Sequence, residues 1–128
     1  MVARDSRIRY LGFRNDVENL YATSDVIVMP SQWEEPCAMV LFEAAAAGKP
    51  VVATATGGTA EVLRHGETGF LVKRDDIEGM TECVARLIQD RDLRIRLGAA
   101  AWRLARSSLA VDPVRQIEEL YASLTLAR

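Results

Sequence analysis

One stretch near the middle of the chain, from Val26 to Thr54, limits what this sequence can fold into. An apolar run, Val26 to Met29, stops at Pro30 and is followed by a polar loop and then by an alanine-rich segment. Gly48 can end a helix over that segment, just before the next apolar run, Val51 to Ala53. This order predicts a strand, a loop, a helix and a second strand. The loop then lies at the carboxyl end of its strand, which is where open parallel sheets bind ligands.

The rest of the chain extends the same pattern. Further strands are expected at Ile8–Leu11 and Phe70–Val72, and a short helix at Thr59–Arg64. Four longer helices are expected after the capping residues Asn15, Asp75 or Asp76, Asp92, and Asp112 followed by Pro113. Apolar side chains at helical spacing predict that Trp102 and the stripe of the final helix belong to the core; the stripe consists of Val114, Ile117, Leu120, Tyr121 and Leu124. The element order predicts an α/β fold, a Rossmann-like doubly wound parallel sheet followed by C-terminal helices.

Length, charge and cysteine content narrow the class of protein. A chain of 128 residues is expected to form a single domain over residues 1–128. A net charge of -2 gives no electrostatic footprint for nucleic acid or for an anionic membrane. No apolar run approaches the ~20 residues of a membrane span. Cys37 and Cys83 fit no metal-ligand spacing and favour a reducing compartment, so the cytoplasm is the expected location.

Two glutamates are the first candidate site residues. Glu35 lies in the loop and Glu43 in the predicted helix, with seven residues between them. A helix that served only the core would have little use for Glu43 beside Phe42 and four alanines. Eight residues of helix span about 12 Å, more than the roughly 5–9.5 Å between glycosidase carboxyls, which disfavours a hydrolase pair. The plainer alternatives are a solvated loop carboxylate for Glu35 and a solvent-facing helix residue for Glu43.

A second loop at the same sheet edge ends in Gly57 and Gly58. Glycine lets the backbone approach a ligand closely or adopt positive φ. A simple tight turn before a helix explains the pair equally well.

These features together resemble the carboxyl-terminal, donor-nucleotide-binding half of a GT-B glycosyltransferase, specifically the retaining family 4, also called glycosyltransferase group 1. The residues that carry the resemblance are Leu11-Gly12, Asp25 to Ser31, Glu35 and Glu43 in the family's E-x7-E spacing, Ala44 to Thr54, Gly57 to Glu61, and His65 to Val72. The chain departs from the family at Cys37-Ala38, where members usually carry Phe-Gly, and at Ala60, where proline is usual.

The resemblance implies roles for the candidate residues. Glu43 maps to the glutamate that holds the ribose hydroxyls of the nucleotide, and Glu35 maps to the donor-sugar side of the cleft as the catalytic candidate. The remaining donor-binding candidates are Cys37, Ala38, Met39, Val40, Gly57 and Gly58, the first four near a helix start whose free amides favour anionic oxygens. The implied reaction is transfer of a sugar from a nucleoside-diphosphate sugar to an acceptor with retention of configuration. No metal or other cofactor is expected.

The resemblance also implies that the chain is a fragment. An amino-terminal acceptor domain and the opening strands of the donor domain are expected to be missing. The fragment alone is therefore expected to be inactive. Peripheral association with a membrane is compatible with the full-length enzyme. The edge of Val26–Met29 should be exposed and should pair with something, either the predicted strand Ile8–Leu11 or a second copy of the chain through edges or swapped elements. A homo-oligomer is the expected outcome. The alternative function is a stand-alone nucleotide-sugar binding module without catalysis. A receiver-type signalling domain and a GT-B epimerase or phosphorylase fit less well.

Overall fold

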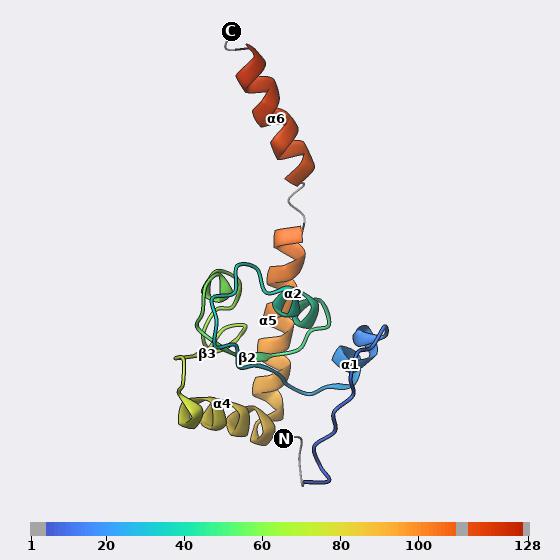
Figure 1. Ribbon diagram of the computed structural model, residues 1–128, viewed down its shortest axis with the longest axis vertical. Coiled ribbons are helices and arrows are strands. Elements are labelled where there is room, and N and C mark those ends of the chain that lie inside the picture. Colours follow the sequence, from blue (N-terminus) through green and yellow to red (C-terminus); the bar gives the residue numbers. More distant parts are fainter. Residues whose placement is uncertain (1–4, 110–112, 127–128) are drawn as a thin grey trace.

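A computed structural model describes residues 5–109 and 113–126 of the chain (Figure 1). Three helices alternate with three short strands in the first part of the described residues, and three longer helices follow the last strand. The elements are α1 (Val17–Thr23), β1 (Ile27–Met29), α2 (Met39–Ala46), β2 (Val51–Thr54), α3 (Thr59–Val62), β3 (Gly69–Val72), α4 (Ile77–Gln89), α5 (Arg91–Leu109) and α6 (Pro113–Leu126).

The strands form one parallel sheet in the order β1-β2-β3. Val28 pairs with Val52 of the central strand, and Val52 pairs in turn with Phe70. Every residue of β2 is buried, as expected for a strand that is covered on both faces by crossover helices. The predicted α/β fold with a Rossmann-like parallel sheet is confirmed.

The two faces of the sheet belong to two hydrophobic clusters. Alternate side chains of β2 point in opposite directions, so Val51 and Ala53 join one cluster and Val52 joins the other. The first cluster, here the α1–α2 cluster, contains Tyr21, Met29, Ala38, Leu41, Ala44 and Leu63 besides the β2 residues. The second, the α4–α5 cluster, contains Phe70, Val72, Leu87, Leu93 and Leu97. The sheet therefore lies between helices of the first half and helices of the second half of the chain.

The predicted strand at Ile8–Leu11 is wrong. The segment forms no strand, and its apolar side chains are exposed, Ile8 by 62% and Tyr10 by 81%. Within the described ranges β1 pairs only with β2, so its other edge is open as the sequence predicts. A strand needs a neighbour to pair its backbone groups, and no neighbouring strand stands beside this segment in the described chain.

Two of the predicted helix caps also need correction. The residue that precedes α1 is Asp16 and not Asn15, and its side chain makes no capping hydrogen bond. At the start of α5, Asp90 replaces the predicted Asp92, because its Oδ1 accepts a 2.8 Å hydrogen bond from the amide of Leu93. The Asp76 cap of α4 is confirmed, with Oδ1 accepting from the Gly79 amide at 2.8 Å.

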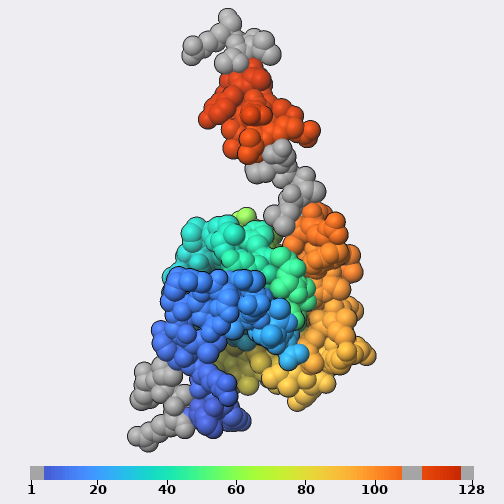
Figure 2. Space-filling view, turned by 90° about the vertical axis from the view of Figure 1, so that its right-hand side faces the viewer, coloured from blue at the N-terminus to red at the C-terminus, as the bar shows by residue number. Residues whose placement is uncertain are grey.

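The last predicted core residues are not buried. Trp102 is 41% exposed, with the Arg106 guanidinium 4.8 Å from its ring centre. Helix α6 begins at Pro113 as predicted, while the expected cap Asp112 lies outside the described residues. The helix lies beyond the end of α5, apart from the sheet (Figures 1 and 2). Its apolar stripe is exposed, Leu120 by 56% and Tyr121 by 66%. The prediction that the stripe is buried fails because helical spacing shows that an apolar face exists but not what covers it. Within the described residues no helix is long and apolar enough to cross a membrane.

Candidate functional site

The carboxyl ends of the three strands meet at one edge of the sheet, and the loops that leave them are tied together. Thr54, the last residue of β2, is buried, and its hydroxyl donates to the carbonyl of Ser31 at 2.5 Å. The same hydroxyl lies 3.3 Å from the carbonyl of Met29 in β1. The exit of β1 is therefore fixed against the exit of β2, which gives the loop after β1 a defined direction.

Glu35 lies where that loop touches the loop after β2. Its Oε1 accepts a 2.7 Å hydrogen bond from the hydroxyl of Ser31, which is itself buried, and its backbone carbonyl accepts from the Gly58 amide at 2.8 Å. Gly57 has φ +50° and passes directly over the Glu35 backbone. The structure thus brings together Glu35, Gly57 and Gly58, three candidates predicted from separate parts of the sequence.

Glu43 lies on α2 with its side chain exposed. Its Oε2 accepts a 2.7 Å hydrogen bond from the hydroxyl of Tyr21 on α1. Tyr21 is 8% exposed and belongs to the α1–α2 cluster. Burial, together with the hydrogen bond to Glu43 and its charge, raises the pKa of Tyr21 to about 12. The carboxylate of Glu43 is therefore held from one side by a side chain that the core fixes in place.

The start of α2 carries the other predicted residues. Ala38 precedes the helix and is buried in the α1–α2 cluster, whereas Cys37, Met39 and Val40 are exposed. Among the described residues, the amides of Met39 and Val40 donate to no carbonyl, as is usual for a first helical turn. Ala38 is part of the core, so the group that this residue offers to a ligand is its backbone amide.

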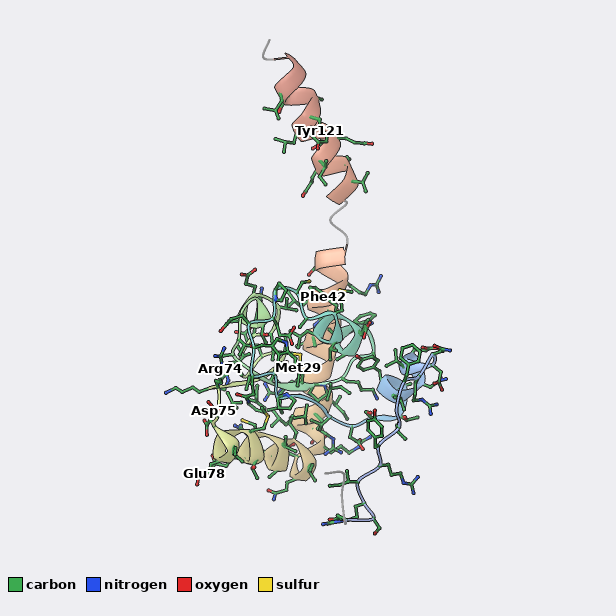
Figure 3. All side chains as sticks on the ribbon, viewed as in Figure 1. Met29, Phe42, Arg74, Asp75, Glu78 and Tyr121 are labelled. Carbon is green, nitrogen blue, oxygen red and sulfur yellow. The ribbon has the colours of Figure 1, made fainter. Side chains whose placement is uncertain are left out.

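Sequence reasoning missed a third link across this edge. The Glu34 carboxylate accepts a hydrogen bond from the Gly57 amide at 2.5 Å and a second one from the Arg74 guanidinium. Arg74, labelled in Figure 3, lies on the loop between β3 and α4. Glu34 joins the loops that follow all three strands. Both partners of the ion pair are exposed, so we expect it to position the loops more than to stabilise the fold. The only available signal was that Arg74 closely follows the carboxyl end of β3. Tyr21 and Ser31, the hydroxyl donors to Glu43 and Glu35, were missed in the same way.

Two buried hydroxyls beside the Gly57–Gly58 loop stand out. Thr56 and Thr59 are 3% and 0% exposed, and neither hydroxyl has a hydrogen-bond partner in the part of the chain that the structure describes. A hollow of about 210 Å³, which neither threonine lines, lies between Pro30 and Thr54 on one side and the start of α4 on the other. A larger groove of about 360 Å³ runs between α2, α3 and α5 and is lined by none of the predicted site residues. Among residues 5–109 and 113–126, no three histidine, cysteine or acidic side chains gather to hold a metal ion.

Comparisons with known proteins agree with one another. The family model described as glycosyl transferases group 1 matches residues 5–103. The D-inositol 3-phosphate glycosyltransferase of Corynebacterium efficiens is 36% identical over 125 residues, which are 96% of this chain and 29% of that protein. The N-acetyl-alpha-D-glucosaminyl L-malate synthase of Bacillus anthracis is 35% identical over 97 residues, 76% of this chain and 25% of that protein.

Solved structures of other proteins also resemble the chain. The crystal structure of Anabaena HepE in complex with UDP-glucose has a TM-score of 0.82 and 33% identity, and the match covers 93% of this chain and 33% of that one. The C-terminal domain of a glycosyl transferase group 1 family protein of Francisella tularensis matches with a TM-score of 0.67 and 26% identity, covering 78% of this chain and 51% of that one. The chain thus spans about a third or less of the length of the Corynebacterium, Bacillus and Anabaena proteins.

Proposed function

Because this chain belongs to the family of group 1 glycosyl transferases, we propose that it forms the donor-binding part of a retaining enzyme that transfers a sugar from a nucleoside-diphosphate sugar to an acceptor. Binding of UDP and UDP-glucose by the similar Anabaena protein supports a nucleotide-sugar donor. Since the chain covers 33% of that protein, we assign acceptor binding to a region outside these residues.

The observation that carries the proposal is that the two predicted carboxylates are both held by hydrogen bonds, Glu35 in the loop after β1 and Glu43 on α2. Glu35 and Glu43 follow the same strand, and each accepts a hydrogen bond from the hydroxyl of a buried residue, Ser31 or Tyr21. A carboxylate can accept two hydrogen bonds from the neighbouring hydroxyls of a ribose ring. We assign this role to Glu43, which is exposed, and we place Glu35 beside the donor sugar because it lies against the Gly57–Gly58 loop.

Two backbone segments near the glutamates offer hydrogen-bond donors for the diphosphate and sugar oxygens. We assign this role to amides at the start of α2, from Cys37 to Val40, and to the glycine loop after β2. Free amides at a helix start favour negative charge. Because the methyl of Ala38 is buried, Ala38 can contact a ligand only through its backbone.

In the proposed reaction the bond between the anomeric carbon and the diphosphate oxygen breaks, and a bond to the acceptor oxygen forms on the same face. The acceptor proton passes to the departing diphosphate. The contribution of the protein is to stabilise the charge that develops on the leaving group. We assign that stabilisation to oriented amides and not to a metal ion.

We further propose that two copies of the chain associate through the open edge of β1. The edge carries backbone groups without a strand partner in the described residues, and Val28 on that strand is 43% exposed. Unpaired edges of this kind recruit further strands.

The proposal is tested by titrating the isotope-labelled chain with UDP, GDP and ADP and following its backbone amide resonances. We expect one nucleotide to give saturable shifts over residues 35–40 and at Gly57 and Gly58. Replacing Glu43 by alanine should abolish them, whereas Glu78→Ala, an exposed glutamate on α4 (Figure 3), should not. Shifts that survive Glu43→Ala, or no response to any of the three nucleotides, would contradict the proposed role of this chain.

A further inference from the structure

We propose that Tyr21 is a positioning residue for recognition of the donor ribose: its hydroxyl holds one oxygen of the Glu43 carboxylate, so that the other oxygen is directed to the nucleotide. The inference rests on the proposed function, because it assumes that Glu43 binds the ribose. It adds a residue from α1, 22 positions away in sequence and outside the glutamate-containing loop and helix.

Tyr21 is suited to this role because it cannot move easily. Its ring is packed in the α1–α2 cluster, which contains residues of α2 and of strands β1 and β2. Helix α1 is also tied to the turn after α2, where Lys49 donates from Nζ to the carbonyl of Ala22 at 2.9 Å. Only the hydroxyl end of Tyr21 reaches the carboxylate, 2.7 Å from Oε2.

Glu43 needs such a support because its side chain lies on the surface of the protein. It is an exposed glutamate, a residue type that loses considerable rotamer freedom when a ligand fixes it. A hydrogen bond from a rigid neighbour fixes the carboxylate before the ligand arrives, which removes part of that penalty from binding. Oε1 of Glu43 makes no hydrogen bond within the described part of the chain and is left for the ribose hydroxyls.

The other glutamate is held in the same way. Ser31 is 7% exposed and donates from its hydroxyl to Oε1 of Glu35 at 2.7 Å. In both carboxylates of the proposed site, one oxygen therefore accepts a hydrogen bond from the hydroxyl of a buried residue. Tyr21 reaches Glu43 from another helix, and Ser31 reaches Glu35 from an earlier position of the same loop. This repetition is what a prearranged site requires and is not needed for core packing.

The test compares two ligands that differ only in the ribose hydroxyls. Dissociation constants for UDP and for 2′,3′-dideoxy-UDP are measured for the unaltered chain, for Tyr21→Phe and for Tyr10→Phe, an exposed tyrosine that serves as the matched control. Loss of one supporting hydrogen bond should weaken UDP binding about threefold to tenfold in Tyr21→Phe. Binding of the dideoxy nucleotide should not change, and Tyr10→Phe should behave as the unaltered chain.

Equal weakening for both ligands would mean that Tyr21 acts only through the structure of the domain and would overturn the proposal. Unchanged UDP binding in Tyr21→Phe would overturn it as well. A separate measurement needs no nucleotide: the side-chain carboxyl ¹³C resonance of Glu43 should move in Tyr21→Phe and not in Tyr10→Phe. If UDP and dideoxy-UDP bind the unaltered chain equally, the ribose role of Glu43 fails, and the carboxyl resonance still decides whether Tyr21 holds Glu43.

Discussion

Gly57 crosses the backbone of Glu35 so closely that a Cβ atom on Gly57 would lie 2.4 Å from the Glu35 carbonyl oxygen. The same atom would lie 2.8 Å from the Glu35 amide nitrogen, and both neighbours are backbone atoms that cannot rotate away. The loop after β2 therefore rests directly on the loop that carries the first glutamate. Each loop fixes the position of the other.

Replacing Gly57 by alanine should destabilise the fold and separate the two loops. Positive φ at a residue other than glycine costs about 1–3 kcal/mol, and the contact with Glu35 adds to this penalty. We expect the free energy of unfolding, measured with urea, to fall by more than the φ penalty alone. The Gly58 amide, which donates to the Glu35 carbonyl, should also exchange its hydrogen faster.

Gly66→Ala is the matched control for that experiment. Gly66 also has positive φ, +77°, but a Cβ there would meet nothing within 4 Å. Its substitution measures the backbone penalty without the contact. Equal losses of stability for Gly57→Ala and Gly66→Ala would show that the close approach of the two loops contributes nothing.

Burial of the Tyr21 phenol, together with its hydrogen bond to Glu43, should make stability depend on pH in the alkaline range. The pKa of Tyr21 is raised from 10.0 to about 12, so between these values the unfolded chain loses the phenol proton while the folded chain keeps it. The contribution of Tyr21 to the free energy of unfolding is therefore fully present below pH 10. It falls as pH rises toward 12, by up to about 1.4 kcal/mol for each pH unit. Urea unfolding between pH 8 and 11 should show this fall in the unaltered chain and a smaller one in Tyr21→Phe. A control variant, Tyr10→Phe, should keep the full slope, and an identical slope in Tyr21→Phe would contradict the raised pKa.

The parts of the fold that the sequence predicts are those with local causes. The apolar runs of β1, β2 and β3 and the Asp76 cap depend on neighbouring residues, and all are found at or within a residue or two of their expected places. The strand expected at Ile8–Leu11 fails because a strand depends on a partner, which a pattern within the segment cannot reveal.

The same distinction applies to the site. The two glutamates and the glycine pair stand out because their residue types are unusual for their positions. The sequence predicts only a core role for Tyr21, because its position on the apolar face of α1 is sufficient reason for an aromatic residue there. Its contact with Glu43 joins residues 22 positions apart and appears only when α1 packs on α2.

Placing a lysine on the open strand should prevent the proposed association. Val28 is 43% exposed, so Val28→Lys buries no charge, and we expect the free energy of unfolding to change by less than about 1 kcal/mol. Lysine on an edge strand disfavours pairing with another edge. Sedimentation velocity over a range of concentrations should show a dimer for the unaltered chain and a monomer for Val28→Lys. A monomer for both proteins at the highest concentration would contradict association through β1.

Gly98→Ala sets two opposing effects against each other in the contact between α2 and α5. Alanine is favoured over glycine inside a helix by about 1 kcal/mol, which by itself would stabilise α5. A Cβ on Gly98, however, would lie 2.1 Å from the carbonyl oxygen of Gly48, a backbone atom in the turn that ends α2. Gly48 is held at φ +66° and leads into β2, so the turn cannot retreat without disturbing the sheet. Overpacking of this kind costs about 1–3 kcal/mol, and with an immobile backbone neighbour we expect the upper part of that range.

The net expectation for Gly98→Ala is therefore a loss of about 1–2 kcal/mol in the free energy of unfolding, as the difference between the two effects. The helix term can be measured separately at Arg96, an exposed position of the same helix, by comparing Arg96→Ala with Arg96→Gly. Subtracting that difference from the Gly98→Ala result isolates the contact with Gly48. A Gly98→Ala protein as stable as the unaltered chain, or more stable, would mean that α5 can move away from the turn after α2. Because that turn leads into the amino end of β2, a movable α5 would also leave the start of that strand less firmly held.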